Sequence, residues 1–125
     1  MRGAVLGLSV LLGLALAAPL SGAEDLEGKT LFRKTCGTCH SSEKGAAGRQ
    51  GPNLFGVVGR AAGTQAGFAY SAAFLKGSDG IVWDQATLDR WLEDPQAVIP
   101  GAIMLYKQKD PAVRARVIAY LDTLH

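Results

Sequence analysis

The five residues Cys36-Gly37-Thr38-Cys39-His40 constrain this chain more than any other stretch. They contain both cysteines of the 125-residue sequence and one of its two histidines. Because the chain has no other cysteine, Cys36 and Cys39 can bridge only each other. The resulting small loop would not connect distant parts of a fold. The stretch therefore indicates local chemistry rather than a disulfide framework.

Three kinds of chemistry are compatible with this stretch. A disulfide between Cys36 and Cys39 would suit redox catalysis more than structure. A structural zinc site usually takes four ligands in two separated pairs, and beyond His40 the chain offers only His125 and carboxylates. The pattern C-x-x-C-H is the attachment signature of c-type haem, in which two thiols add to the haem vinyl groups and the histidine becomes an axial ligand. Only this last interpretation explains why all three residues are contiguous.

The first residues have the pattern of a secretory signal peptide. Arg2 precedes an apolar run that ends at Ala18, and small residues occupy 21–23. A retained membrane anchor is the alternative, but the run is shorter than the roughly 20 residues of a spanning helix. We therefore expect cleavage before Glu24 and a soluble, exported, periplasmic protein. The predicted domains are a signal peptide, 1–23, and one folded domain, 24–125.

Met104 is the candidate for a second axial ligand. Met1 would leave with the signal peptide, so Met104 is the one remaining methionine, 64 residues after His40. His125 is the other candidate, but it is the last residue and chain ends are often poorly ordered. A single methionine usually packs in a hydrophobic core. The wider sequence context therefore decides whether Met104 is a core residue or an iron ligand.

Seven motifs occur in an order that resembles a known family. They are GxxLF, CGTCH, GPNLFGVVGR, GFAYS, GIVW, IPGAIM and VIAYL. The sequence from Gly28 to Leu124 resembles class I c-type cytochromes, most closely mitochondrial cytochrome c and its soluble bacterial periplasmic relatives. The resemblance implies an all-α, cytochrome c-like fold, with short helices and glycine-rich loops wrapped around one covalent haem and with crossing terminal helices.

The resemblance also implies which residues hold the haem. Cys36 and Cys39 correspond to the thioether attachments, and His40 and Met104 to the axial ligands of the iron. Pro52 lies in the Gly51–Leu54 loop under His40, and its carbonyl would accept the other imidazole N–H, as partners of ligating histidines generally do.

Other matched positions surround the haem. Arg60, Tyr70 and Trp83 correspond to residues that hydrogen-bond or shield the buried haem propionates, which need partners when they leave water. Two positions depart from the family pattern. Trp91 replaces a tyrosine that hydrogen-bonds the methionine sulfur in many relatives, and Ala102 replaces a frequent threonine that helps to hold one propionate.

Apolar spacing and capping residues predict the helices. A first helix is expected at 25–35 and a last helix after the Asp110-Pro111 start signal, because Asp is a good N-cap and Pro a good first residue. Because the resemblance implies that the terminal helices cross, Gly28 and Phe32 are expected to meet Val117 and Tyr120. Two short helices are predicted at 71–76 and 84–93, with Pro95 ending the latter region, and no strand is predicted.

Iron with two protein ligands offers no position for a substrate. The sequence therefore predicts an electron carrier rather than an enzyme, in which Met/His ligation gives a relatively high potential. The expected role is shuttling single electrons between respiratory or photosynthetic membrane complexes, or periplasmic dehydrogenases, and a terminal acceptor. The alternatives are a haem subunit of a dehydrogenase or oxidase complex, a ligand sensor or peroxidase if Met104 is labile, and a thiol–disulfide oxidoreductase.

Charge limits the partners. No basic stripe with interleaved aromatics occurs, so nucleic-acid binding is unsupported. Mitochondrial relatives carry lysines around the haem edge, whereas the matching positions here are Thr35, Gln96, Ala97 and Ile103. We therefore expect a monomer that docks transiently at the haem edge through an unusually apolar face.

Overall fold

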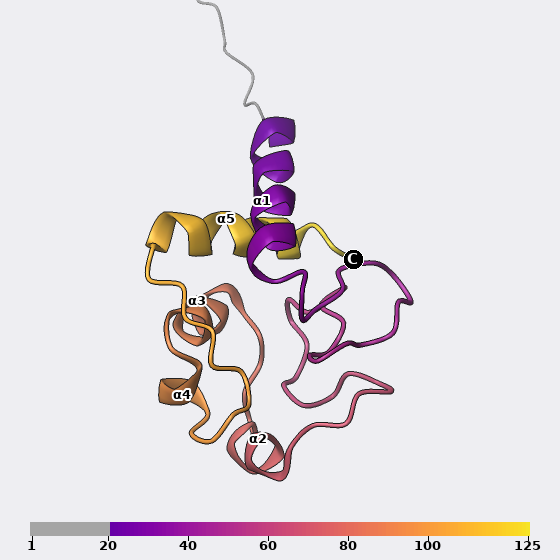
Figure 1. Ribbon diagram of the computed structural model, residues 1–125, viewed down its shortest axis with the longest axis vertical. Coiled ribbons are helices and arrows are strands. Elements are labelled where there is room, and N and C mark those ends of the chain that lie inside the picture. Colours follow the sequence, from indigo (N-terminus) through magenta and orange to yellow (C-terminus); the bar gives the residue numbers. More distant parts are fainter. Residues whose placement is uncertain (1–20) are drawn as a thin grey trace, which may run out of the picture.

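The computed structural model describes residues 21–125, so most of the predicted signal peptide, 1–23, lies outside the described residues (Figure 1). The regular structure in this part of the chain is α-helical and is joined by long loops, with one isolated bridge between Ala61 and Val82 and no sheet. No helix within residues 21–125 has the length and apolar character needed to cross a bilayer. The helices are α1 (Ser21–Thr35), α2 (Ala72–Gly77), α3 (Gln85–Glu93), α4 (Pro95–Val98) and α5 (Pro111–Asp122).

The terminal helices cross where α1 has no side chain. Figure 1 shows α5 running across the C-terminal half of α1. Gly28 is buried at the crossing, and a Cβ atom there would lie 2.5 Å from the Arg116 carbonyl oxygen and 2.8 Å from Tyr120 Cβ. The Phe32 and Tyr120 rings pack with their centroids 5.6 Å apart. The predicted meeting of Gly28 and Phe32 with Tyr120 is confirmed, and Val117 is buried in the same core.

The predicted start of the first helix is wrong by four residues, because α1 begins at Ser21 rather than at Asp25. Nothing between these positions stops a helix: Gly22 and Ala23 have no proline after them, and Glu24 in the first turn favours the helix dipole. The helix therefore continues through the predicted cleavage bond between Ala23 and Glu24.

Side-chain caps start the other predicted helices within one residue of expectation. The Ser71 hydroxyl accepts a hydrogen bond from the Phe74 N–H at the start of α2. The Asp84 carboxylate accepts one from Thr87 at 2.7 Å and starts α3. Asp110 does the same for α5, with Pro111 at its first position. Each cap satisfies a backbone donor that has no partner inside the helix.

The short helix α4 was not predicted. Pro95 was expected only to end the preceding region, but it also occupies the first turn of a new helix. Proline suits that position because its missing N–H would have no intrahelical partner. Asp94 caps α4 by accepting a hydrogen bond from the Gln96 N–H at 3.1 Å. The chain therefore makes two consecutive helices, α3 and α4, before the segment that carries Met104.

Arg114 fixes the end of that segment. Its side chain is buried, and Nε donates to the Asp89 carboxylate at 2.7 Å, which ties α5 to α3. The same guanidinium donates to the carbonyl oxygens of Gln108 and Lys109 at 3.0 and 3.2 Å. The loop between α4 and α5 is thus held at its C-terminal end by Nη1 of an arginine whose Nε is bound to α3.

Candidate haem site

One cavity of about 430 Å³ brings the predicted site residues together. Its size lies within the roughly 300–1,000 Å³ of cofactor and ligand sites. Its walls come from the loop after α1, from α3 and α5, and from the loop after α4. All nine predicted residues line it: Cys36, Cys39, His40, Pro52, Arg60, Tyr70, Trp83, Trp91 and Met104.

The His40 imidazole is oriented by a backbone carbonyl. Its Nδ1 lies 2.8 Å from the Pro52 carbonyl oxygen, which can only accept, so Nδ1 carries the proton and Nε2 keeps its lone pair. Burial lowers the pKa of His40, and the Pro52 hydrogen bond opposes this shift to a smaller extent. A neutral imidazole with a free Nε2 is the form that binds a metal.

Gly51 makes room for that imidazole. A Cβ atom at this position would lie only 2.1 Å from His40 Cε1. The Gly51 N–H donates to the Cys39 carbonyl oxygen at 2.8 Å, so the loop that contains Gly51 is fastened to the cysteine motif. The family resemblance placed this loop under His40, but the steric role of Gly51 was missed because it depends on contact with a residue eleven positions earlier in the chain.

Asn53 holds the same loop in place and was also missed. Its amide donates to the carbonyl oxygens of Glu43 and Ala46, both at 2.8 Å, and its Oδ1 accepts from the Phe55 N–H at 2.9 Å. The side chain is buried and all its bonds go to backbone. The only sequence signal for it was its position directly after Pro52.

No disulfide joins Cys36 and Cys39, and both side chains are partly exposed and line the cavity. Burial raises the pKa of Cys36, although a hydrogen bond with the Thr35 hydroxyl opposes the shift. Reactive dithiols in oxidoreductases depend on a lowered thiol pKa. The environment of Cys36 therefore disfavours thiol–disulfide catalysis.

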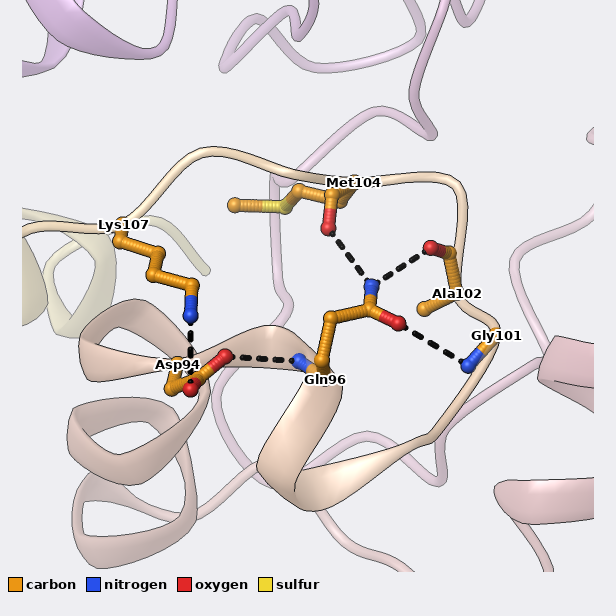
Figure 2. A network of polar contacts seen from close by, with 6 residues as sticks. All are labelled: Asp94, Gln96, Gly101, Ala102, Met104 and Lys107. Carbon is orange, nitrogen blue, oxygen red and sulfur yellow. Dashed lines mark hydrogen bonds and ion pairs between the residues drawn. The ribbon is translucent and has the colours of Figure 1, made fainter.

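The Met104 wall is a loop without regular secondary structure. Met104 is half-buried between the exposed side chains of Ile103 and Leu105. In Figure 2, Met104 lies on the loop segment drawn above α4, and its backbone carbonyl is directed toward Gln96. Ala102, which departs from the family pattern, is buried and lines the cavity, where it has no side-chain hydroxyl to offer.

Arg60 supplies a positive charge to the cavity. Its guanidinium donates to the carbonyl oxygens of Asn53 and Phe55 at 3.1 and 3.3 Å and to the Gln65 side chain. Burial lowers the pKa of Arg60, yet within residues 21–125 no carboxylate forms an ion pair with it. A partly buried guanidinium without a carboxylate suits a ligand that carries its own anionic group.

Aromatic side chains form the remaining wall. The centroids of Trp83 and Trp91 are 5.2 Å apart, and Phe74 meets Trp91 edge-on at 5.9 Å. Tyr70 stacks on Phe74 at 5.0 Å and accepts a hydrogen bond from the Gln65 N–H. These contacts make a rigid apolar surface, which fits the flat macrocycle of a haem.

The donor set fits haem better than a bare metal ion. Within residues 21–125 no three His, Cys, Asp or Glu side chains are grouped to hold a metal, so the zinc interpretation has no support. The cavity instead combines two thiols, one imidazole and one thioether with apolar walls and one unpaired guanidinium. These are the groups that a covalent haem with two propionates requires.

Comparisons with known proteins agree with this geometry. The family model for cytochrome c matches residues 26–125. The chain is 46% identical to cytochrome c2 of Rhodopila globiformis, over 81% of this chain and 93% of the relative. It is 50% identical to cytochrome c2 iso-2 of Magnetospirillum fulvum (71% and 91%) and 42% identical to cytochrome c of Guizotia abyssinica (75% and 84%).

The chain therefore belongs to the cytochrome c family. It is a single-haem electron carrier with one covalently bound haem c, as the sequence motifs predicted. The comparisons give no support to the alternative roles as a sensor, a peroxidase or a subunit of a larger enzyme.

We predict that Gly51→Ala destabilises the holoprotein by about 2–4 kcal/mol. The new methyl group would overpack the His40 ring, at about 1–3 kcal/mol, and weaken its hydrogen bond to Pro52, at about 1 kcal/mol. Denaturant unfolding of the ferric protein measures the change. Pro52→Ala is the control, since it keeps the carbonyl and should cost less than about 1 kcal/mol. Equal stabilities for Gly51→Ala and the wild type would contradict the steric role.

Proposed function

We propose that this cytochrome is a soluble periplasmic shuttle whose haem is attached to Cys36 and Cys39 and whose iron is bound by His40 and Met104. The observation that carries the proposal is the cavity, which both predicted iron ligands line although 64 residues separate them. The cysteine pair lines the same cavity beside His40.

The haem supplies a one-electron couple, and the residues of the chain determine how that couple behaves. His40, held by Pro52, presents Nε2 in a fixed orientation. The Met104 thioether favours the ferrous state and so raises the potential. The apolar walls act in the same direction, because burial disfavours the more highly charged ferric form. If His40 and Met104 both bind the iron, no position would remain for a substrate, so we propose no enzymatic activity.

We predict that Met104→His lowers the reduction potential by on the order of 0.1 V or more, within the roughly 0.8 V range that axial ligands span. An imidazole stabilises ferric iron better than a thioether does. Potentiometric titration measures the change. Ile103→Val is the matched control, because this neighbouring side chain is 77% exposed and should leave the potential unaltered. Identical potentials in the wild type and Met104→His would contradict ligation by Met104.

The rim of the cavity beside Met104 is the proposed docking face. Ile103 and Leu105 are 77% and 74% exposed, and both line the cavity. The nearby Lys107 is paired with Asp94 at 2.8 Å, which reduces its effect on a partner. Removal of Arg2 lowers the formal net charge by one from +2, and two ionised propionates would make it slightly negative. Partners are then membrane redox complexes or periplasmic redox enzymes that a monomer contacts transiently.

We predict a weak salt dependence of electron transfer. Raising the salt concentration from about 10 to 200 mM should change the second-order rate of reduction by less than about threefold, because an apolar face gives little electrostatic steering. Stopped-flow reduction by quinol-treated membranes of the source organism measures this rate. The charge-adding variant Ile103→Lys is the comparison and should respond more strongly to salt. A steep decline of the wild-type rate would contradict the proposed face.

Export and maturation complete the proposal. The pattern of residues 1–23 favours a signal peptide, and c-type haem is attached outside the cytoplasm. We propose cleavage between Ala23 and Glu24, which would remove the first three residues of α1, all outside the Gly28 crossing. The exported protein should have the mass of residues 24–125 plus one haem. A mass that retains the apolar segment would indicate an anchored protein.

A further inference from the structure

The loop that carries Met104 has few backbone hydrogen bonds of its own. Residues 99–110 connect α4 to α5. Inside this loop the Ala102 N–H donates to the Ile99 carbonyl oxygen at 3.1 Å, and near its end the Gln108 N–H donates to Leu92 at 2.7 Å. The stretch between these points, which contains Met104, depends on side chains for its conformation.

The side chain of Gln96 forms hydrogen bonds with the backbone of this stretch (Figure 2). Its Nε2 donates to the carbonyl oxygens of Ala102 and Met104 at 2.7 and 3.3 Å, and its Oε1 accepts from the Gly101 N–H at 3.0 Å. One amide thus binds three backbone groups at and after the turn at Gly101, which has a positive φ of 83°. Only an amide combines the required donors and acceptor in one group.

Gln96 is itself held at the start of α4. Its backbone N–H donates to Asp94 Oδ1, while Asp94 Oδ2 binds Lys107 Nζ at 2.8 Å. Asp94 and Gln96 therefore reach the loop on both sides of Met104 (Figure 2). The Asp94–Lys107 pair is largely solvent-accessible and contributes little alone. We call the contacts of Asp94 and Gln96 with the loop the clamp, and the hydrogen bonds of Gln96 are its stronger part.

We propose that Gln96 is a positioning residue that keeps the Met104 loop closed, so that the thioether stays on the iron and external ligands are excluded. The inference rests on the proposed ligation by Met104. Gln96 is bonded to the backbone of that same residue, so losing the amide weakens the loop where the ligand is attached. Because the rest of the fold is held by the α1–α5 crossing and by Arg114, the effect should be local opening rather than unfolding.

The test is binding of imidazole to the ferric holoprotein, followed by absorption, since imidazole must displace Met104 to reach the iron. Gln96→Ala should bind imidazole about tenfold more tightly than the wild type, which corresponds to about 1.4 kcal/mol and suits the loss of one or two net hydrogen bonds. Gln96→Glu keeps the shape and the acceptor but loses both N–H donors, and should show a similar gain.

Gln85→Ala is the matched control, because Gln85 is an exposed glutamine on α3 whose amide bonds only Asp122, away from the loop. Its imidazole affinity should equal that of the wild type. Denaturant midpoints of all variants separate local opening from general loss of stability. Unchanged affinity in both Gln96 variants would overturn the proposal, as would an equal gain in Gln85→Ala.

The same spectra distinguish the two levels of the account. The wild-type ferric protein should show the weak red band of methionine-bound haem before imidazole is added. If the band is present and the Gln96 variants bind imidazole as the wild type does, the clamp is wrong while ligation by Met104 stands. If the band is absent, ligation by Met104 and the clamp both fail.

Discussion

The cavity between the His40 loop and the Met104 loop is the constraint on which the rest of the structure depends. Its lining is drawn from nearly the whole described chain, from Thr35 to Leu121. A domain of about 100 residues has a modest core, and here the cavity passes through that core. Trp83, Leu88 and Trp91 belong both to the buried cluster and to the cavity wall. The haem that the family carries is therefore part of the hydrophobic interior as well as the redox centre.

Two different devices support the opposite walls of this cavity. The His40 side is fixed by backbone-directed bonds: Pro52 to the imidazole, Gly51 to Cys39, and the Asn53 amide to three backbone groups. The Met104 side has no such density of backbone pairing and relies on the amide of Gln96 and on Arg114 at the end of the loop. The His40 ring is thus held mainly by the backbone of its own loop, while the position of Met104 depends on a few side chains that substitution can remove.

Sequence reasoning was most successful where the determinant is local. The Asp110-Pro111 start and the Asp84 cap each specify a helix start within a few residues, and the structure has the predicted helices there. Gly28 was also anticipated, because a small residue on an apolar helix face allows close crossing. The start of α1 and the existence of α4 were missed, since both depend on weak preferences at helix ends.

Recognition of the cavity residues needed more than local patterns. Arg60, Tyr70 and Trp83 have ordinary surface or core interpretations, and only the family resemblance assigned them to one site. The steric role of Gly51 and the clamp formed by Gln96 involve partners that the chain brings close in space rather than in sequence. Neither residue type indicates such a role in a sequence, because glycine and glutamine are common in loops for other reasons. Their roles became visible only with the distances to His40, Gly101 and Met104.

The most direct test of the central claim is the absorption spectrum of the exported protein in its oxidised and reduced states. The account predicts a c-type haem spectrum in both states, together with the weak red band that methionine sulfur gives on ferric haem. A c-type spectrum that lacks this band would contradict Met104 as the second ligand. The absence of haem from the purified protein would contradict the account of the cavity as a whole.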